Sequence, residues 1–176
     1  MTTTNKAKAV FFDRDGTLNV DTEYLHRTED FIWIEDAREA IKYVNDRGYL
    51  AILATNQSGV ARGYYPEEDV KIIYDWMNQD LAKIGAHLDA LYYCPHHPQG
   101  PLPAYRKVCT CRKPDTGMID EACKRFHIDR SQSYFVGDSD RDMECAQRAG
   151  LTGIRYVKGS LLERIKAIDT SVKTLG

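Results

Sequence analysis

Two aspartates stand two positions apart near the start of the chain, in the run Asp13-Arg14-Asp15-Gly16-Thr17. Both carboxylates can face one small site, because Gly16 permits a turn that most residues resist. One carboxylate can attack the phosphorus of a phosphate monoester and form an acyl phosphate. The other can protonate the leaving alcohol and later deprotonate the attacking water. An isolated Asp-x-Asp-Gly is often only an acidic turn, so this interpretation depends on the motifs that accompany it.

Three further motifs supply what such a reaction needs. The run from Gly137 to Asp142 adds carboxylates, including Asp138, and oxygen ligands around a phosphoryl group favour Mg²⁺. Thr55 and Asn56 offer a hydroxyl and amides to phosphoryl oxygens. Lys113 offers the positive charge that a phosphoryl transition state needs. Together these motifs predict a magnesium-dependent phosphatase.

A second metal site is predicted in residues 94–112, a loop rich in proline, cysteine and histidine. Three thiols and one imidazole form the closed tetrahedral set that is typical of structural Zn²⁺. His97 is the alternative to His96 as the imidazole ligand, and a chance cluster of reduced thiols is the alternative to a metal site. A metal here would fix the approach of Lys113, which follows directly. The four expected ligands are Cys94, His96, Cys109 and Cys111.

Size and charge limit the possible partners. A chain of 176 residues fits a single domain, residues 1–176, and its net charge of −2 supplies no field that would attract nucleic acid or an anionic membrane. Neither an export signal nor a membrane-spanning run is apparent. We therefore expect a cytoplasmic monomer that binds a small substrate, with no nucleic acid or membrane as partner.

The elements that must position these motifs alternate along the chain. Strands are expected at 9–12, 49–54, 88–93, 134–136 and 154–157, each a short apolar run. Helices are expected after Asp36, which forms a capping box with Glu39, and at 66–84, 118–126, 143–149 and 161–168.

This alternation predicts an α/β fold, a three-layer doubly wound sandwich around a parallel sheet. Ligands bind such sheets beyond the carboxyl ends of the strands. The polar residues at 13–15, 55–56, 94–96 and 138–142 each follow a strand. All four sets are therefore expected at one rim.

The order of these motifs resembles the haloacid dehalogenase (HAD) superfamily of phosphatases from end to end. The resemblance implies a HAD-like Rossmannoid fold, with Asp13 as nucleophile and Asp15 as general acid/base. It implies that Thr55 and Lys113 stabilise the phosphoryl group. Mg²⁺ would be bound by Asp13, the backbone carbonyl of Asp15, and Asp138, while Asp142 would orient Lys113 or the groups around the metal.

The zinc loop and the run Thr-Asn-Gln-Ser-Gly at 55–59 narrow the resemblance. The chain is similar to the D-glycero-D-manno-heptose-1,7-bisphosphate 7-phosphatases, which serve the synthesis of nucleotide-activated heptose for lipopolysaccharide and other cell-surface glycans. The histidinol-phosphate phosphatases are the alternative. The resemblance implies a substrate site formed by Arg112, by Asp21, Thr22, Glu23 and Tyr24, and by Asn56, Gln57 and Ser58. Ser139 is a departure, because many of these enzymes carry a basic residue there.

No cap domain fits between the motifs. The segment from Gly16 to the second strand has room for a loop and one helix only. The segment from Thr55 to Lys113 is taken up by one helix, one strand and the zinc loop, so neither holds a separate unit of about 50 residues or more. We therefore expect a capless enzyme whose specificity comes from short loops, chiefly 18–35, 57–65 and 95–112.

Overall fold

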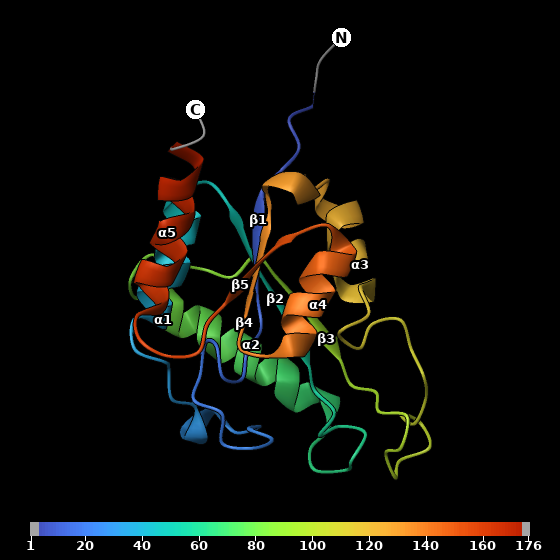
Figure 1. Cartoon of the computed structure of the whole chain (residues 1–176). Coiled ribbons are helices and arrows are strands. Elements are labelled where there is room, and N and C mark those ends of the chain that lie inside the picture. The colour runs from blue at the N-terminus through green and yellow to red at the C-terminus, as the bar shows by residue number, and fades with distance from the viewer. Residues whose placement is uncertain (1–3, 174–176) are drawn as a thin grey trace.

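The computed structural model describes the backbone of residues 4–173 and the side chains of residues 4–168. Its centre is a five-stranded sheet in the order β3-β2-β1-β4-β5, and every neighbouring pair is parallel (Figure 1). The strands are β1 (Ala9–Phe12), β2 (Leu50–Asn56), β3 (Ala90–Cys94), β4 (Tyr134–Gly137) and β5 (Thr152–Arg155). The predicted parallel α/β sheet is confirmed.

Helices cover both faces of this sheet, as the three-layer prediction requires. One face packs against α1 (Ala37–Asp46), α2 (Glu67–Ala82) and α5 (Leu161–Lys173). The other face packs against α3 (Gly117–Phe126) and α4 (Asp140–Ala149). Two single 3-10 turns, η1 (Thr28–Asp30) and η2 (Arg130–Gln132), lie in the connections.

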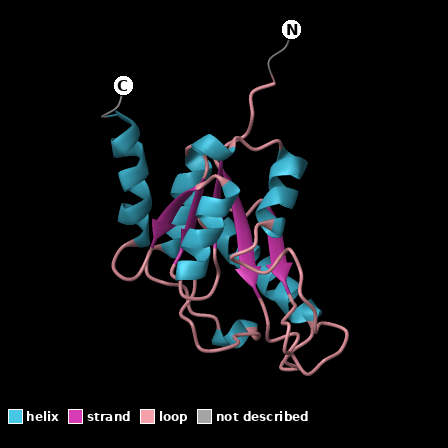
Figure 2. Cartoon of the chain, turned by 45° about the vertical axis from the view of Figure 1, so that its right-hand side comes forward, coloured by secondary structure: helices cyan, strands magenta, loops and turns pink. Residues whose placement is uncertain are grey.

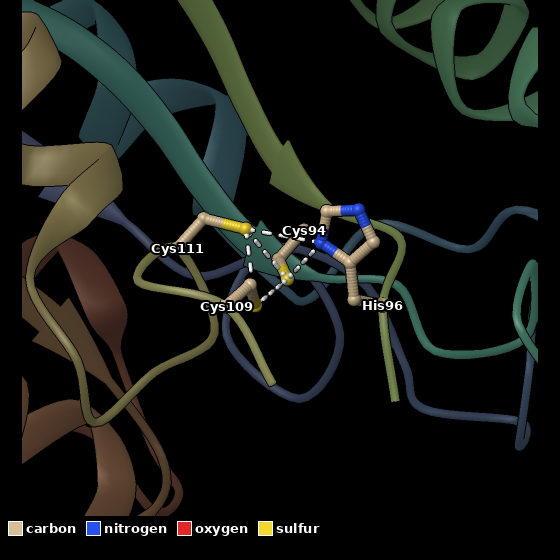
Figure 3. A group of neighbouring side chains, drawn as sticks. All are labelled: Cys94, His96, Cys109 and Cys111. Atoms are coloured by element: carbon tan, nitrogen blue, oxygen red, sulfur yellow. Dashed lines mark hydrogen bonds between the residues drawn. The ribbon is translucent and has the colours of Figure 1, made fainter. Parts of the chain in front are cut away.

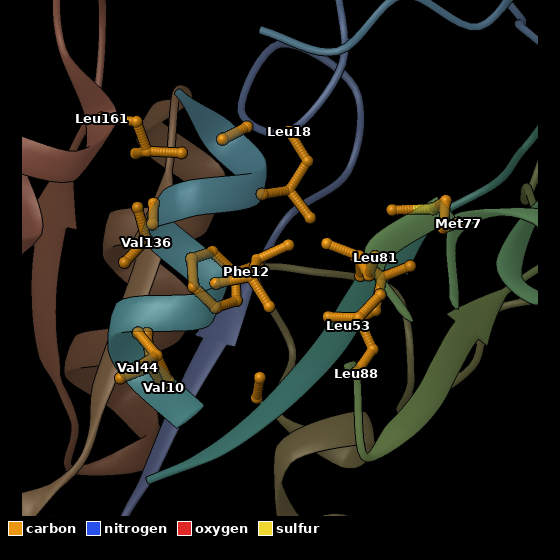
Figure 4. Close-up of a cluster of buried hydrophobic side chains, with 14 of the residues drawn as sticks. Val10, Phe12, Leu18, Val44, Leu53, Met77, Leu81, Leu88, Val136 and Leu161 are labelled. Atoms are coloured by element: carbon orange, nitrogen blue, oxygen red, sulfur yellow. The ribbon is translucent and has the colours of Figure 1, made fainter. Parts of the chain in front are cut away.

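The central strand shows why both layers form. Successive side chains of a strand point to opposite faces. In β1, Val10 and Phe12 belong to the core under α1, α2 and α5, whereas Ala9 and Phe11 belong to the core under α3 and α4. Figure 4 shows Phe12 among the side chains of the first core. Fully burying a side chain of this size contributes about 1.5–3 kcal/mol.

The capping box predicted at the start of α1 is wrong. Asp36 has a φ of 57°, a left-handed conformation, and its side chain makes no capping hydrogen bond to α1. Its carboxylate instead accepts hydrogen bonds from the hydroxyl of Ser160 and from the backbone N–H of Leu162, at 3.2 Å for the latter. Asp36 therefore ties the start of α5 to the start of α1, a long-range contact that local pattern cannot reveal.

A capping box that sequence pattern missed begins α4. Ser139 accepts from the backbone N–H of Asp142, and Asp142 accepts in return from the backbone N–H of Ser139. The helix therefore starts at Asp140, three residues before the predicted start. The last strand also lies two residues earlier than predicted, at Thr152–Arg155.

The long loops follow β1, β2 and β3, at the carboxyl ends of the strands. In Figure 2 the strands point into this group of loops, which lies below the sheet. The segment between β1 and α1 holds only η1, and that between β2 and α2 holds neither helix nor strand, so the fold has no cap domain there. Within residues 4–173, no helix has both the length and the apolar composition needed to cross a membrane.

Candidate active site

Lys113 is fully enclosed at the carboxyl ends of the central strands. Its Nζ lies 2.9 Å from Asp13 Oδ1, 2.7 Å from Asp142 Oδ1 and 2.9 Å from the backbone oxygen of Ala54. An ammonium group has three N–H donors, so these three acceptors use all of them. The side chain is 2% exposed and its position is therefore fixed before any substrate arrives.

The charges around Lys113 do not balance. Burial raises the pKa of Asp13 to about 7, with Asp142 and Asp15 adding to the effect of burial and Lys113 opposing it. Burial, with Asp142, also raises the pKa of Asp138. Burial alone would lower the pKa of Lys113, but Asp13 and Asp142 outweigh it and raise that pKa. An excess of carboxylate at a buried site favours a bound cation.

The carboxylates of Asp13, Asp138 and Asp142 can hold a metal ion, because one oxygen from each lies within 4.8 Å of the others. Gly16 makes room for this group. A Cβ atom at Gly16 would lie 2.2 Å from Asp138 Oδ2, and the φ of Gly16 is +83°. Both the space and the backbone conformation therefore require glycine.

Asp142 contributes differently from Asp13 and Asp138. Its Oδ1 binds Lys113, and its Oδ2 accepts from the hydroxyl of Ser139 at 2.9 Å and from the N–H of Ser139 at 3.3 Å. With both oxygens engaged and 1% of the residue exposed, Asp142 mainly orients Lys113. Ser139 is the N-cap of helix α4 and holds Asp142 in place.

Asp15 is held by the side chains of Asn19, Gln57 and Arg14. Its Oδ1 accepts from Asn19 Nδ2 at 3.0 Å, and its Oδ2 accepts from Gln57 Nε2 at 3.2 Å. Arg14, which is 2% exposed, reaches both oxygens at 3.2 and 3.3 Å. The two aspartates of the first motif thus have different partners, which suits two different roles.

These side chains open onto a cleft of about 490 Å³. The cleft brings together Asp13, Asp15, Lys113 and Asp138 with seven of the residues expected at the substrate site: Asp21, Glu23, Tyr24, Asn56, Gln57, Ser58 and Arg112. Thr22 does not line it and faces a neighbouring hollow instead. Thr55 does not line the cleft either. It is 1% exposed, and its hydroxyl accepts from Gln57 Nε2 at 3.0 Å.

Two cleft arginines, Arg62 and Arg141, were missed by sequence reasoning. They line the cleft together with Arg112, and none of the three forms an ion pair within residues 4–168. The Nε of Arg62 is buried without a hydrogen-bond partner. Burial lowers the pKa of Arg112, and the positive charges of Arg141 and Arg62 add to that effect. An unpaired group of arginines favours a bound anion.

The predicted zinc ligands converge, as Figure 3 shows. The sulfur of Cys94 lies 2.9 Å from that of Cys111 and 3.5 Å from that of Cys109, and His96 Nδ1 lies 3.4 Å from the sulfur of Cys111. Tetrahedral Zn–S bonds of about 2.3 Å would place sulfurs roughly 3.8 Å apart. The four side chains can therefore hold a zinc ion with small adjustments. His97, the alternative ligand, is outside this group.

Comparison with known proteins agrees with this site. Residues 110–167 match the family model described as HAD-hydrolase-like. The chain is 48% identical over 172 residues to D-glycero-beta-D-manno-heptose-1,7-bisphosphate 7-phosphatase of Haemophilus ducreyi, covering 96% of this chain and 94% of that one. It is also 42% identical to D-glycero-alpha-D-manno-heptose-1,7-bisphosphate 7-phosphatase of Photorhabdus laumondii, and the match covers 88% of this chain and 84% of that one.

A solved structure extends the match to three dimensions. The D,D-heptose 1,7-bisphosphate phosphatase of B. bronchiseptica, complexed with magnesium and phosphate, is 31% identical with a TM-score of 0.76, covering 92% of this chain and 86% of that one. Identity of this extent over nearly the whole length of the relatives establishes common family membership. The chain belongs to the HAD superfamily of phosphatases, in the family of the D-glycero-D-manno-heptose-1,7-bisphosphate 7-phosphatases.

Proposed function

We propose that the chain removes the 7-phosphate of D-glycero-D-manno-heptose 1,7-bisphosphate, in the synthesis of nucleotide-activated heptose. The observation that carries this proposal is the pairing of two different anion-binding features in one cleft. Asp13 and the buried Lys113 line this cleft, and so do Arg62, Arg112 and Arg141, which form no ion pairs within residues 4–168. A substrate with a phosphate at each end uses both features.

Asp13 is the nucleophile in this proposal. A carboxylate oxygen of Asp13 forms a bond to phosphorus while the bond from phosphorus to the sugar oxygen breaks. Asp15 gives its proton to that sugar oxygen, which leaves as an alcohol. Asp15 then takes a proton from water as the water oxygen attacks phosphorus, and inorganic phosphate and the free Asp13 carboxylate result.

The positive charge needed for this reaction has two sources. Lys113, already bound to Asp13, neutralises the phosphoryl oxygens. Asp13, Asp138 and the backbone carbonyl of Asp15 would hold Mg²⁺, which would supply Lewis-acid stabilisation of the phosphoryl group. The fit of the ion rests on the carboxylate cluster and on the absence of a side chain at Gly16.

The remaining site residues recognise the sugar and its second phosphate. The arginines are suited to the 1-phosphate, because guanidinium groups form paired hydrogen bonds with phosphate oxygens. Asp21, Glu23 and Tyr24 also line the cleft and offer acceptors and an aromatic ring to the sugar hydroxyls. Thr55 accepts a hydrogen bond from Gln57 and so helps to hold this cleft residue in place. The zinc loop acts as a structural element that delivers Arg112 and Lys113.

The proposal includes a cytoplasmic monomer with a small sugar phosphate as its substrate and neither nucleic acid nor membrane as partner. The cleft of about 490 Å³ supports a small substrate, and the net charge of −2 argues against nucleic acid and an anionic membrane as partners.

The test measures inorganic phosphate released from heptose 1,7-bisphosphate and from histidinol phosphate in parallel, with Mg²⁺, and identifies the sugar product. The expected result is rapid conversion of the bisphosphate to the 1-phosphate, with little turnover of histidinol phosphate. Asp13→Asn is the control and should abolish turnover. Preferential hydrolysis of histidinol phosphate, or release of the 1-phosphate, would contradict the proposal.

A further inference from the structure

The amide of Gln57 is held in one orientation by its four neighbours. Its Oε1 accepts from the hydroxyl of Tyr65 at 2.6 Å and from Arg14 Nη2 at 3.4 Å. Its Nε2 donates to Asp15 Oδ2 at 3.2 Å and to Thr55 Oγ1 at 3.0 Å. Rotation of the amide by half a turn would set its NH₂ group against two donors at a buried position, which is costly. Gln57 can therefore only donate to Asp15.

Tyr65 enforces this orientation because its own position is fixed. The residue is 6% exposed and its ring stacks on that of His26, with centroids 5.1 Å apart. The ring also lies directly over Gly59, where a Cβ atom would be 2.2 Å from Tyr65 Cε1. Burial raises the pKa of Tyr65 to about 12, so the hydroxyl keeps its proton and donates it to Gln57. This contact explains why glycine ends the Thr55–Gly59 run.

The carboxylate of Asp15 is thus oriented by three neighbouring side chains. Gln57 reaches one carboxylate oxygen, Asn19 reaches the other, and Arg14 spans both. Arg14 is itself anchored by the backbone oxygen of Leu25 at 2.9 Å. A general acid must lie within hydrogen-bond reach of the leaving oxygen, so its direction affects the rate of proton transfer.

We infer that Tyr65 is a positioning residue for proton transfer by Asp15, and that it acts through the side-chain amide of Gln57. The inference rests on the proposed function, which makes Asp15 the general acid. It predicts a defect that depends on the leaving group. A sugar alcohol needs a proton as the bond from phosphorus to oxygen breaks, whereas 4-nitrophenolate leaves without one.

The experiment compares Tyr65→Phe with the unchanged protein on heptose 1,7-bisphosphate and on 4-nitrophenyl phosphate. General acid catalysis contributes about 10²–10⁴-fold, and misdirecting the acid should lose part of it, roughly tenfold in kcat/KM on the sugar phosphate. The value of kcat/KM covers only the steps up to release of the leaving group, so the later attack of water, which also uses Asp15, does not enter it. On the aryl ester kcat/KM should stay within about twofold. A purely structural role would lower both rates together.

Tyr74→Phe is the matched control. Tyr74 lies on helix α2 and does not line the cleft, and its hydroxyl donates to the backbone oxygen of Leu88 at 3.2 Å. This variant removes a comparable hydrogen bond and should leave the ratio of the two rates unchanged. A changed ratio in Tyr74→Phe would show that the ratio reports general destabilisation, and this would overturn the inference.

Gln57→Leu and the double variant with Tyr65→Phe test the route through the amide. If Tyr65 acts through Gln57, the double variant is no slower on the sugar phosphate than Gln57→Leu alone. Additive losses, or an equal loss on both esters, would overturn the inference. Should Tyr65→Phe fail to fold, the rate ratio of Gln57→Leu decides in the same way. An unchanged protein that hydrolyses neither ester would instead refute the proposed function.

Discussion

Asn56 holds the backbone of Lys113 from both sides. The backbone N–H of Lys113 donates to Asn56 Oδ1 at 3.0 Å, and Asn56 Nδ2 donates to the backbone oxygen of Lys113 at 3.2 Å. Asn56 ends strand β2, and Lys113 follows the zinc loop, 57 residues later. The pair therefore joins two segments whose relative position decides where the ammonium group of Lys113 lies.

Replacing Asn56 by Asp tests this link with little change of shape. A carboxylate still accepts from the N–H of Lys113 but opposes its backbone oxygen, so the paired contact is lost. We expect kcat to fall at least about tenfold, together with a loss of about 1 kcal/mol in the free energy of unfolding. Steady-state kinetics and urea denaturation measure the two effects.

Asn45→Asp is the control for that variant. Asn45 pairs with the backbone of His87 in the same two-way pattern, at 2.8 and 3.1 Å, far from the cleft lining. The Asn45→Asp variant should show a similar loss in the free energy of unfolding and an unchanged kcat. If Asn56→Asp is no slower than Asn45→Asp, the link does not position Lys113.

Asp142→Ala should destabilise the protein by about 3 kcal/mol, because it removes one partner of a buried ion pair. The coupling is measured by urea denaturation of this variant, Lys113→Met and the double variant. In the Lys113→Met background, Asp142→Ala should lower the free energy of unfolding by less, because no buried ammonium group is then left without its partner. An equal loss of unfolding free energy in both backgrounds would mean that Asp142 stabilises only helix α4, through its hydrogen bonds with Ser139.

Gly16→Ala should raise the Mg²⁺ concentration needed for half-maximal activity by about tenfold or more. The new methyl group would meet Asp138 Oδ2 at 2.2 Å and push that carboxylate out of the metal cluster. Gly48→Ala is the control, because Gly48 has a similar φ of +79° but no atom within 4 Å of the added methyl group. A similar Mg²⁺ requirement in both variants would contradict the steric explanation.

Cys109→Ser should reduce bound zinc well below one ion per chain, as measured by metal analysis of the purified protein. Loss of the ion should lower stability by about 3 kcal/mol, or roughly 6–12 °C in Tm. Cys123→Ser is the comparison variant, because Cys123 is a buried residue of helix α3 and lies outside the metal cluster. A Cys109→Ser protein that loses zinc but keeps its Tm and kcat would show that the loop and Lys113 are independent.

Sequence pattern alone predicts much of this molecule, because chemistry and fold share the same signals. Strands β1 to β4 are short, mostly apolar runs, and a motif with the residue types of a phosphatase follows the end of β1, β2 and β4. The ends of parallel strands must meet at one edge of the sheet, so Asp13, Asn56 and Asp138 were predictable neighbours. Cysteine spacing likewise predicted the group around Cys94.

Contacts between distant loops were not predictable in this way. Asp36 has the sequence context of a helix cap, yet a left-handed backbone turns its carboxylate toward the start of α5. Arg62 stands in the run Ala61–Gly63 and Arg141 in the run Gly137–Asp142, but neither run shows where the guanidinium group lies, and only the folded cleft brings the two residues to Arg112. The Tyr65–Gln57–Asp15 chain depends on amide orientation, which the type of residue does not fix.

The central claim is that Asp13 is the nucleophile. The most direct measurement is to quench the enzyme with acid during turnover of heptose 1,7-bisphosphate, reduce it with borohydride and sequence its peptides by mass spectrometry. Borohydride converts an acyl phosphate to an alcohol, so residue 13 should appear as homoserine, and only when substrate was present. Reduction at Asp15 or Asp138 instead, or turnover by Asp13→Asn at an undiminished rate, would contradict the claim.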